Sequence, residues 1–112
     1  MVTPAVGSVV LVRFPFSDLS QAKLRPAVVL ANAGRGDWVL CQITSNPYGD
    51  RLAIAIRDAD FAVGSLRLVS HARPGKLFTG SGALMVREVG RLTPDCIERL
   101  IEAAVHVLRS GT

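Results

Sequence analysis

The chain has 112 residues, 49% of them hydrophobic and 20% charged, with a formal net charge of +4. This length and composition predict a single compact domain over residues 1–112 and exclude a disordered tail. The positive charge permits nucleic-acid binding without proving it, whereas an aromatic share of 5% argues against a broad base-stacking platform.

Several other classes of protein are disfavoured by the sequence. No apolar run approaches the ~20 residues of a membrane span, and the start of the chain lacks the basic and apolar pattern of a signal peptide. Cys41 and Cys96 lie within apolar stretches and are expected to be small buried residues in a reducing compartment. The spacing of His and Cys suggests no metal and no cofactor. We therefore expect a cytoplasmic protein without membrane contacts.

The first half of the chain predicts three strands. An apolar run over residues 6–14 forms the first, and a polar loop over 15–22 follows it. Residues 26–31 and 38–43 are two further apolar runs, and between them lies a stretch rich in Asn, Gly and Asp. That composition predicts a β-hairpin with its turn at 32–37.

The second half predicts shorter strands and one helix. Strands are expected over 51–57, 65–73, 76–79 and 83–90, with a connection at 58–64. Thr93 suits the helix N-cap, Pro94 the first helical position and Asp95 the positive end of the helix dipole. Apolar residues then recur at helical spacing up to Leu108. The whole predicts a mainly β fold, a small antiparallel barrel with a C-terminal helix.

Pairing within the hairpin decides which side chains meet at its open end. With an even turn, Asn32 faces Asp37, Ala27 faces Gln42 and Arg25 faces Thr44, whereas an odd turn sets Arg25 against Ser45. The even register collects Val28, Leu30, Val39, Cys41 and Ile43 on one apolar face. On the other face a guanidinium, a hydroxyl and an amide converge, which suits a phosphodiester. The alternative is that Arg25 is a surface charge and Thr44 an ordinary strand residue.

Five blocks of the sequence together resemble the PemK/MazF family of bacterial toxins. They are GSVVLVRFPF (7–16), KLRPAVVL (23–30), QITS (42–45), RPGKLFT (73–79) and VGRLTPD (89–95). The blocks span nearly the whole chain and occur in the family's order. Where many members carry an acidic residue after the fourth block, this chain reads Gly80-Ser-Gly-Ala, which leaves the contribution of that segment to binding open.

The resemblance implies an SH3-like barrel of the PemK/MazF/CcdB type that works as a homodimer. It implies metal-independent, sequence-specific cleavage of single-stranded RNA, and a cognate antitoxin with a DNA-binding segment and an acidic tail. The family's catalytic arginine and threonine match Arg25 and Thr44, the pair that the even register sets face to face. A basic residue that contacts the substrate matches Arg73.

The chemistry assigns further residues around this pair. Arg25 would stabilise the charge that develops on phosphorus, Thr44 would hold a phosphate oxygen, and Gln42 or Ser45 would assist. Arginine is always protonated, so the base is sought elsewhere, and Asp18 is the candidate. The loop residues Ser17, Ser20 and Phe16 are expected to line the site. Phe16 is a better stacking candidate than Trp38, although core packing is favoured for both rings. His71 and His106 are interpreted as structural or solvent-exposed.

Two other functions remain open at this point. CcdB-like toxins share the fold but poison a topoisomerase through protein contacts, and an inactive barrel could bind RNA or protein. The presence of both Arg25 and Thr44 favours the enzyme, because a pure binder does not need that pair.

Overall fold

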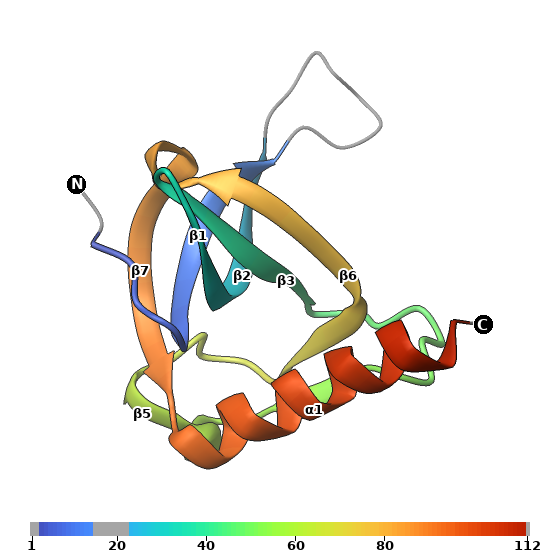
Figure 1. The fold of residues 1–112 in the computed structure, drawn as a ribbon. Helices are drawn as coiled ribbons and strands as arrows, with labels where there is room; N and C mark the ends of the chain where they lie inside the picture. The colour runs from blue at the N-terminus through green and yellow to red at the C-terminus, as the bar shows by residue number, and fades with distance from the viewer. Residues whose placement is uncertain (1–2, 15–22, 112) are drawn as a thin grey trace.

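The computed structural model describes residues 3–14 and 23–111, which form one curled antiparallel sheet and a C-terminal helix (Figure 1). The sheet has seven strands in the order β4-β6-β3-β2-β1-β7-β5. Their bounds are β1 Ser8–Phe14, β2 Lys23–Gly34, β3 Asp37–Thr44, β4 Ile54–Ile56, β5 Phe61–Gly64, β6 Ser70–Ser81 and β7 Met85–Leu92. Two short 3₁₀ turns, Asp58–Asp60 and Gly82–Leu84, precede β5 and β7. The expected mainly β fold with a C-terminal helix is confirmed.

Apolar residues on both faces of the central strands are buried, in two clusters. The first joins Val28, Leu30, Cys41 and Ile43 of the hairpin to Cys96 and Leu100 of the helix. The second lies on the other face and contains the buried side chains of Val10, Val12, Ala27, Val29, Leu40 and Met85, with Trp38 and Phe78 packed against them. Strands with both faces covered read as nearly continuous apolar runs, as these do. The packing interpretation of Trp38 is thereby confirmed.

The helix α1, Pro94–Ser110, begins and ends where the sequence predicts (Figure 1). The Thr93 hydroxyl accepts the Cys96 N–H at 3.3 Å, and Gly111 takes the left-handed conformation at the C-terminal end. Cys96, Leu100 and Ala104 are buried against the sheet, whereas Val105 and Leu108 are 41% and 71% exposed. The last turns of the apolar stripe therefore face away from the core.

The strands after the hairpin differ from the prediction in extent. The strand expected over 51–57 shrinks to β4, because Asp50 closes a local turn by accepting the Leu52 N–H at 2.9 Å. The strand expected at 65–73 starts only at Ser70. Before it, Ser65 accepts the Arg67 N–H at 2.8 Å and Arg67 has a φ of 67°, so the chain turns there. Residues 61–64, expected as a connection, form β5 against β7.

The hairpin register is as predicted from Ala27 to Val29 and wrong at the tip. Ala27 pairs with Gln42 as expected, but Asn32 faces Trp38 instead of Asp37. The Asn32 carboxamide oxygen accepts the Gly34 N–H at 2.8 Å, and Gly34 has a φ of 88°. The pairing shifts at two irregularities, one between Val29 and Ala31 and one between Asn32 and Gly34, and this local hydrogen bond competes with the ladder at the second. Val39, expected in the first cluster, is consequently only half-buried.

Both cysteines are free and buried, as expected. Burial raises the pKa of the Cys41 thiol to about 12, although a backbone hydrogen bond with Arg73 acts the other way. Burial likewise raises the pKa of Cys96. Within the described ranges, no helix is both long enough and apolar enough to span a membrane.

Candidate functional site

The candidate site lies at the open end of the β2–β3 hairpin. Arg25, near the start of β2, is exposed and pairs in register with Val12 of β1. Thr44 ends β3 and is half-buried. Both residues line one cavity of about 250 Å³, whose wall also includes Ser45. The remaining lining residues are Leu11, Leu24, Pro26, Ile43, Leu66, Leu68 and Ser70. An arginine and three hydroxyl-bearing residues therefore border a largely apolar hollow.

The Thr44 hydroxyl organises the chain that follows it. Its Oγ1 donates to the Asn46 carbonyl at 2.9 Å and accepts the Asn46 N–H at 3.2 Å. This short loop of hydrogen bonds ends β3 and fixes the position of the oxygen. A hydroxyl held in this way is a suitable partner for a phosphate oxygen that enters the site.

A large irregularity in β6 brings Arg73 to the same end of the hairpin. Cys41 pairs with Leu77 and Ile43 with Ala72, so residues 73–76 stand opposite the single residue Gln42. Pro74 within this segment has no N–H to give to a ladder. The Cys41 thiol donates to the Arg73 carbonyl at 3.2 Å and anchors the extruded segment. Gln42 itself is half-buried.

Arg73 forms an ion pair with Asp50, from the loop after Thr44. Nε of Arg73 donates to Oδ2 of Asp50 at 2.8 Å, and the two side chains are 22% and 15% exposed. The guanidinium holds the pKa of Asp50 below its usual range, with help from the Leu52 N–H. This contact uses one of the five guanidinium N–H donors of Arg73, and contact of Arg73 with a substrate stays a prediction.

His71, for which the sequence suggests no partner in the site, lies in register with Thr44. Thr44 of β3 and Ala55 of β4 both pair with His71 of β6. Directly opposed residues point to the same face of a sheet, with Cβ atoms about 5 Å apart. The ring is half-buried, and its Nδ1 is buried without a hydrogen-bond partner among the described residues. The strand pattern alone could not reveal this neighbour, because the register of β6 depends on the extruded segment at 73–76.

Four of the residues predicted to line the site lie outside the described residues. They are Phe16, Ser17, Asp18 and Ser20 of the β1–β2 connection. Of the other predictions, Arg25, Thr44 and Ser45 line the cavity, while Gln42 and Arg73 flank it through the β3–β6 pairing.

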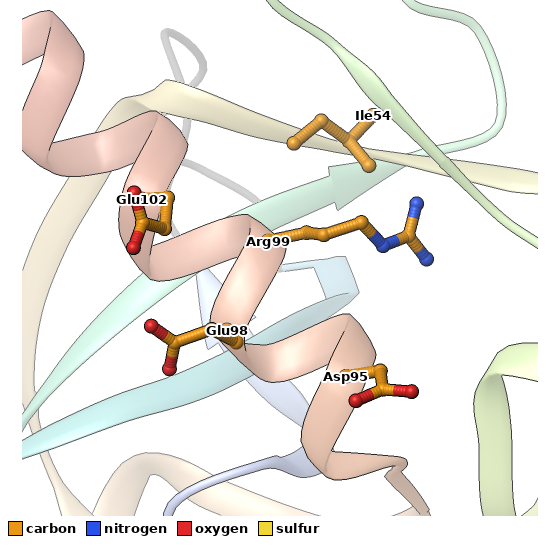
Figure 2. Close-up of a pocket in the computed structure, with 5 residues that line it drawn as sticks. All are labelled: Ile54, Asp95, Glu98, Arg99 and Glu102. Carbon is orange, nitrogen blue, oxygen red and sulfur yellow. The ribbon is translucent and has the colours of Figure 1, made fainter.

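A second, larger hollow of about 740 Å³ lies beside α1 (Figure 2). Asp95, Glu98, Arg99 and Glu102 of the helix line it together with Ile54 of β4. Figure 2 shows the Arg99 side chain extending below Ile54, while Glu98 and Glu102 point to the other side of the helix. Arg99 also contacts Asp60 at 2.9 Å. Three carboxylates against one guanidinium disfavour a polyanion here, so we place the candidate site at the hairpin.

Among the residues that the structure describes, no group of three or more His, Cys, Asp or Glu side chains could hold a metal ion. The site is thus built from a guanidinium, hydroxyls, an amide and an imidazole, on a small basic β-barrel.

Residues 5–108 match the family of PemK-like, MazF-like toxins of type II toxin–antitoxin systems, and the chain belongs to this family. No curated protein matches the chain significantly.

Solved structures similar to this chain share its fold at low sequence identity. One is MazE-MazF (Form-III) from Deinococcus radiodurans, with a TM-score of 0.75, 17% identity and coverage of 96% of this chain and 97% of that one. Another is an endoribonuclease in complex with its cognate antitoxin from a mycobacterial species, with a TM-score of 0.73, 16% identity and 95% coverage of both chains. A third is the Mycobacterium tuberculosis toxin MazF-mt6, with a TM-score of 0.70, 18% identity and coverage of 91% of this chain and 96% of that one.

Proposed function

We propose that this toxin is an endoribonuclease that cleaves single-stranded RNA at specific sequences. The observation that carries the proposal is that Arg25 and Thr44, from two different strands, line the same cavity together with Ser45. Membership of the toxin family and the likeness to structures described as endoribonucleases support it.

The chemistry proposed for this site uses the substrate's own 2′-hydroxyl. Its oxygen attacks the adjacent phosphorus, the P–O2′ bond forms and the P–O5′ bond breaks, which leaves a 2′,3′-cyclic phosphate and a 5′-hydroxyl. Arg25 stabilises the dianionic transition state as a preorganised donor, and Thr44 binds a phosphate oxygen. The 2′-hydroxyl proton passes to a base, for which Asp18 remains the prediction, and the departing 5′-oxygen takes a proton from water.

The experiment is incubation of the purified toxin with a long single-stranded RNA of mixed sequence in the presence of EDTA. We expect discrete fragments whose 3′ ends carry a cyclic phosphate and whose cut sites share a short sequence. Intact RNA, or cleavage that requires a divalent cation, would contradict the proposal.

The proposal includes a homodimer with two equivalent sites. Leu24 and Leu68, on the cavity wall, are 45% and 59% exposed, and Val69 beside them is 45% exposed. Apolar surface of this kind around a polar site is typical of a protein interface, and a two-fold dimer is the commonest way to cover it. Light scattering that shows a monomer at micromolar concentration would contradict this part.

The proposal also includes a cognate antitoxin with an acidic segment that folds onto the basic site. Arg25 lines the cavity, and Lys23, also exposed, directly precedes the lining residue Leu24. Exposed cations of this kind attract both RNA and an acidic chain. We expect excess single-stranded RNA to compete with the antitoxin segment in a titration. Independent binding of both would place them on separate surfaces.

A further inference from the structure

The loop after Thr44 contains a tight turn with a tyrosine at its second position. The Asp50 N–H donates to the Pro47 carbonyl at 2.9 Å, and the two central residues, Tyr48 and Gly49, have φ values of 52° and 75°. Positive φ at both central positions defines a type I′ turn, which strongly favours Asn-Gly. Gly49 fits this preference. Tyr48 occupies a position where a bulky side chain is strained.

The strained residue also leaves its ring in solvent. Tyr48 is 78% exposed, so the side chain gains little from burial that would offset its backbone conformation. The other aromatic side chains whose burial is described, Trp38, Phe61 and Phe78, pack against the two core clusters. Strain that persists without a packing reason is a recurrent property of functional positions.

Hydrogen bonds fix the turn relative to the candidate site. The Tyr48 N–H donates to the Asn46 carboxamide oxygen at 2.9 Å. Asn46 is in turn held by the Thr44 hydroxyl, and Asp50 at the end of the turn is held by Arg73 at 2.8 Å. The backbone of the turn that carries the exposed ring is thus anchored on both sides by residues of the proposed site.

We propose that Tyr48 is a specificity-determining residue that stacks on an RNA base next to the cleaved phosphate. This inference rests on the proposed function and deepens it. An aromatic face fixed beside cationic side chains is the usual way to hold an unpaired base while the backbone follows the charges. Two arginines supply positive charge near this turn. Arg51 is exposed and follows Asp50 on the same loop, and Arg73 on β6 forms the ion pair with Asp50. The base that stacks on Tyr48 then determines which nucleotide of the RNA lies against Thr44.

The first test compares Tyr48→Ala with Tyr48→Phe on a long single-stranded RNA of mixed sequence. Loss of stacking onto one base raises KM by roughly 5- to 150-fold, with a smaller change in kcat, whereas Tyr48→Phe keeps the ring and stays near the parent. Sequencing of fragment ends should show that Tyr48→Ala relaxes the base preference at one position of the cut site. A structural role would leave that preference unchanged.

The second test separates stability from recognition. Tyr48→Asn restores the preferred Asn-Gly turn, so thermal unfolding should move upward by up to roughly 5 °C. The same variant should cleave as poorly as Tyr48→Ala. A more stable protein with a higher KM is the pattern expected of a residue retained for its ligand.

The possible outcomes distinguish this inference from the proposed function. If the parent protein does not cleave RNA, the proposed function fails and the inference fails with it. If the parent cleaves and both Tyr48→Ala and Tyr48→Asn keep its KM and its cut sites, the proposed function stands and the inference is overturned. A Tyr48→Phe variant as impaired as Tyr48→Ala would also overturn stacking, because the phenol hydroxyl would then be the active group.

Discussion

The turns at the two ends of the β2–β3 hairpin have the same backbone conformation but are held by different contacts. At the tip, Arg35 and Gly36 have φ values of 57° and 81°, and beyond the open end Tyr48 and Gly49 have 52° and 75°. The tip is tied to the rest of the fold through its backbone, where the Gly82 N–H donates to the Gly36 carbonyl at 2.9 Å. The turn beyond the open end is tied to the Thr44 hydroxyl through Asn46 and to the Arg73 side chain through Asp50. A strained turn therefore does not identify a site, whereas its side-chain partners do.

The largest expected contrast between the two ends is between two exposed arginines. We predict that Arg25→Ala lowers the cleavage rate by roughly 100- to 1000-fold, because a preorganised charged donor is lost where charge develops. Arg35→Ala at the tip removes the same charge and should leave the rate within about threefold, since a single exposed charge acts only through screened long-range attraction. The measurement is cleavage of one RNA under identical salt.

Circular dichroism provides the control for that contrast, because both arginines are exposed and neither variant should unfold the protein. Arg25→Lys should recover little activity, since a point charge does not reproduce the planar fork. Undiminished cleavage by folded Arg25→Ala would move the active site away from the hairpin.

A second contrast concerns two threonines. Thr44→Val keeps the shape and strand preference of the residue but removes the hydroxyl, and we expect cleavage to slow by roughly 10- to 100-fold, the value of a hydrogen bond to a charged group. Thr79 on β6, which pairs with Val39 near the tip, is exposed. Thr79→Val should therefore cleave at the parent rate. Full activity of Thr44→Val would mean that the Thr44 hydroxyl serves only to hold the chain at Asn46 and does not act in cleavage.

The sequence predicted the regular parts of this fold, and it predicted that Arg25 and Thr44 would lie at the same end of the hairpin, where both line one cavity. The helix bounds follow from Thr93 and Gly111, and the register at Ala27–Gln42 follows from the alternation of apolar residues. Both depend on short-range patterns that are visible directly in the sequence.

The parts that could not be predicted depend on local hydrogen bonds that override the pattern. Asn32 shifts the tip register by binding the Gly34 N–H, and the extruded segment at 73–76 resets the pairing of β6. That reset sets His71 opposite Thr44, and it carries Arg73 to Asp50. No periodicity in the sequence marks either event, because each involves an irregularity of the ladder.

The third prediction concerns the ion pair that holds the loop of Tyr48. The pKa of Asp50 is lowered by Arg73, so the pair contributes its full stability above the ordinary pKa of aspartate, about 3.9. This contribution is lost as the pH falls through the lowered folded pKa. Asp50→Asn should reduce the free energy of unfolding at pH 7 by less than about 1 kcal/mol.

A double-mutant cycle with Arg73→Gln, measured by urea unfolding at pH 7 and at pH 2.5, tests this assignment. The coupling energy between the two positions should be present at pH 7 and smaller at pH 2.5. A coupling that is equal at both pH values would mean that packing, rather than charge, joins Arg73 to Asp50.

The smallest expected effect comes from placing the same residue, asparagine, in each of the two turns. Arg35→Asn creates the preferred Asn-Gly turn at the tip, and we expect it to stabilise the protein by up to about 1 kcal/mol, since a side chain with a Cβ is strained at positive φ. Tyr48→Asn makes the same change beyond the open end and should give a similar gain in urea unfolding. Cleavage measured at two salt concentrations then distinguishes them: Arg35→Asn should cut at the parent sites at both, whereas Tyr48→Asn should not. If the two variants gained equal stability and retained equal cleavage, both turns would serve the fold alone. The two turns share one backbone conformation, so the inference expects them to differ only in that Tyr48 contacts the RNA and Arg35 does not.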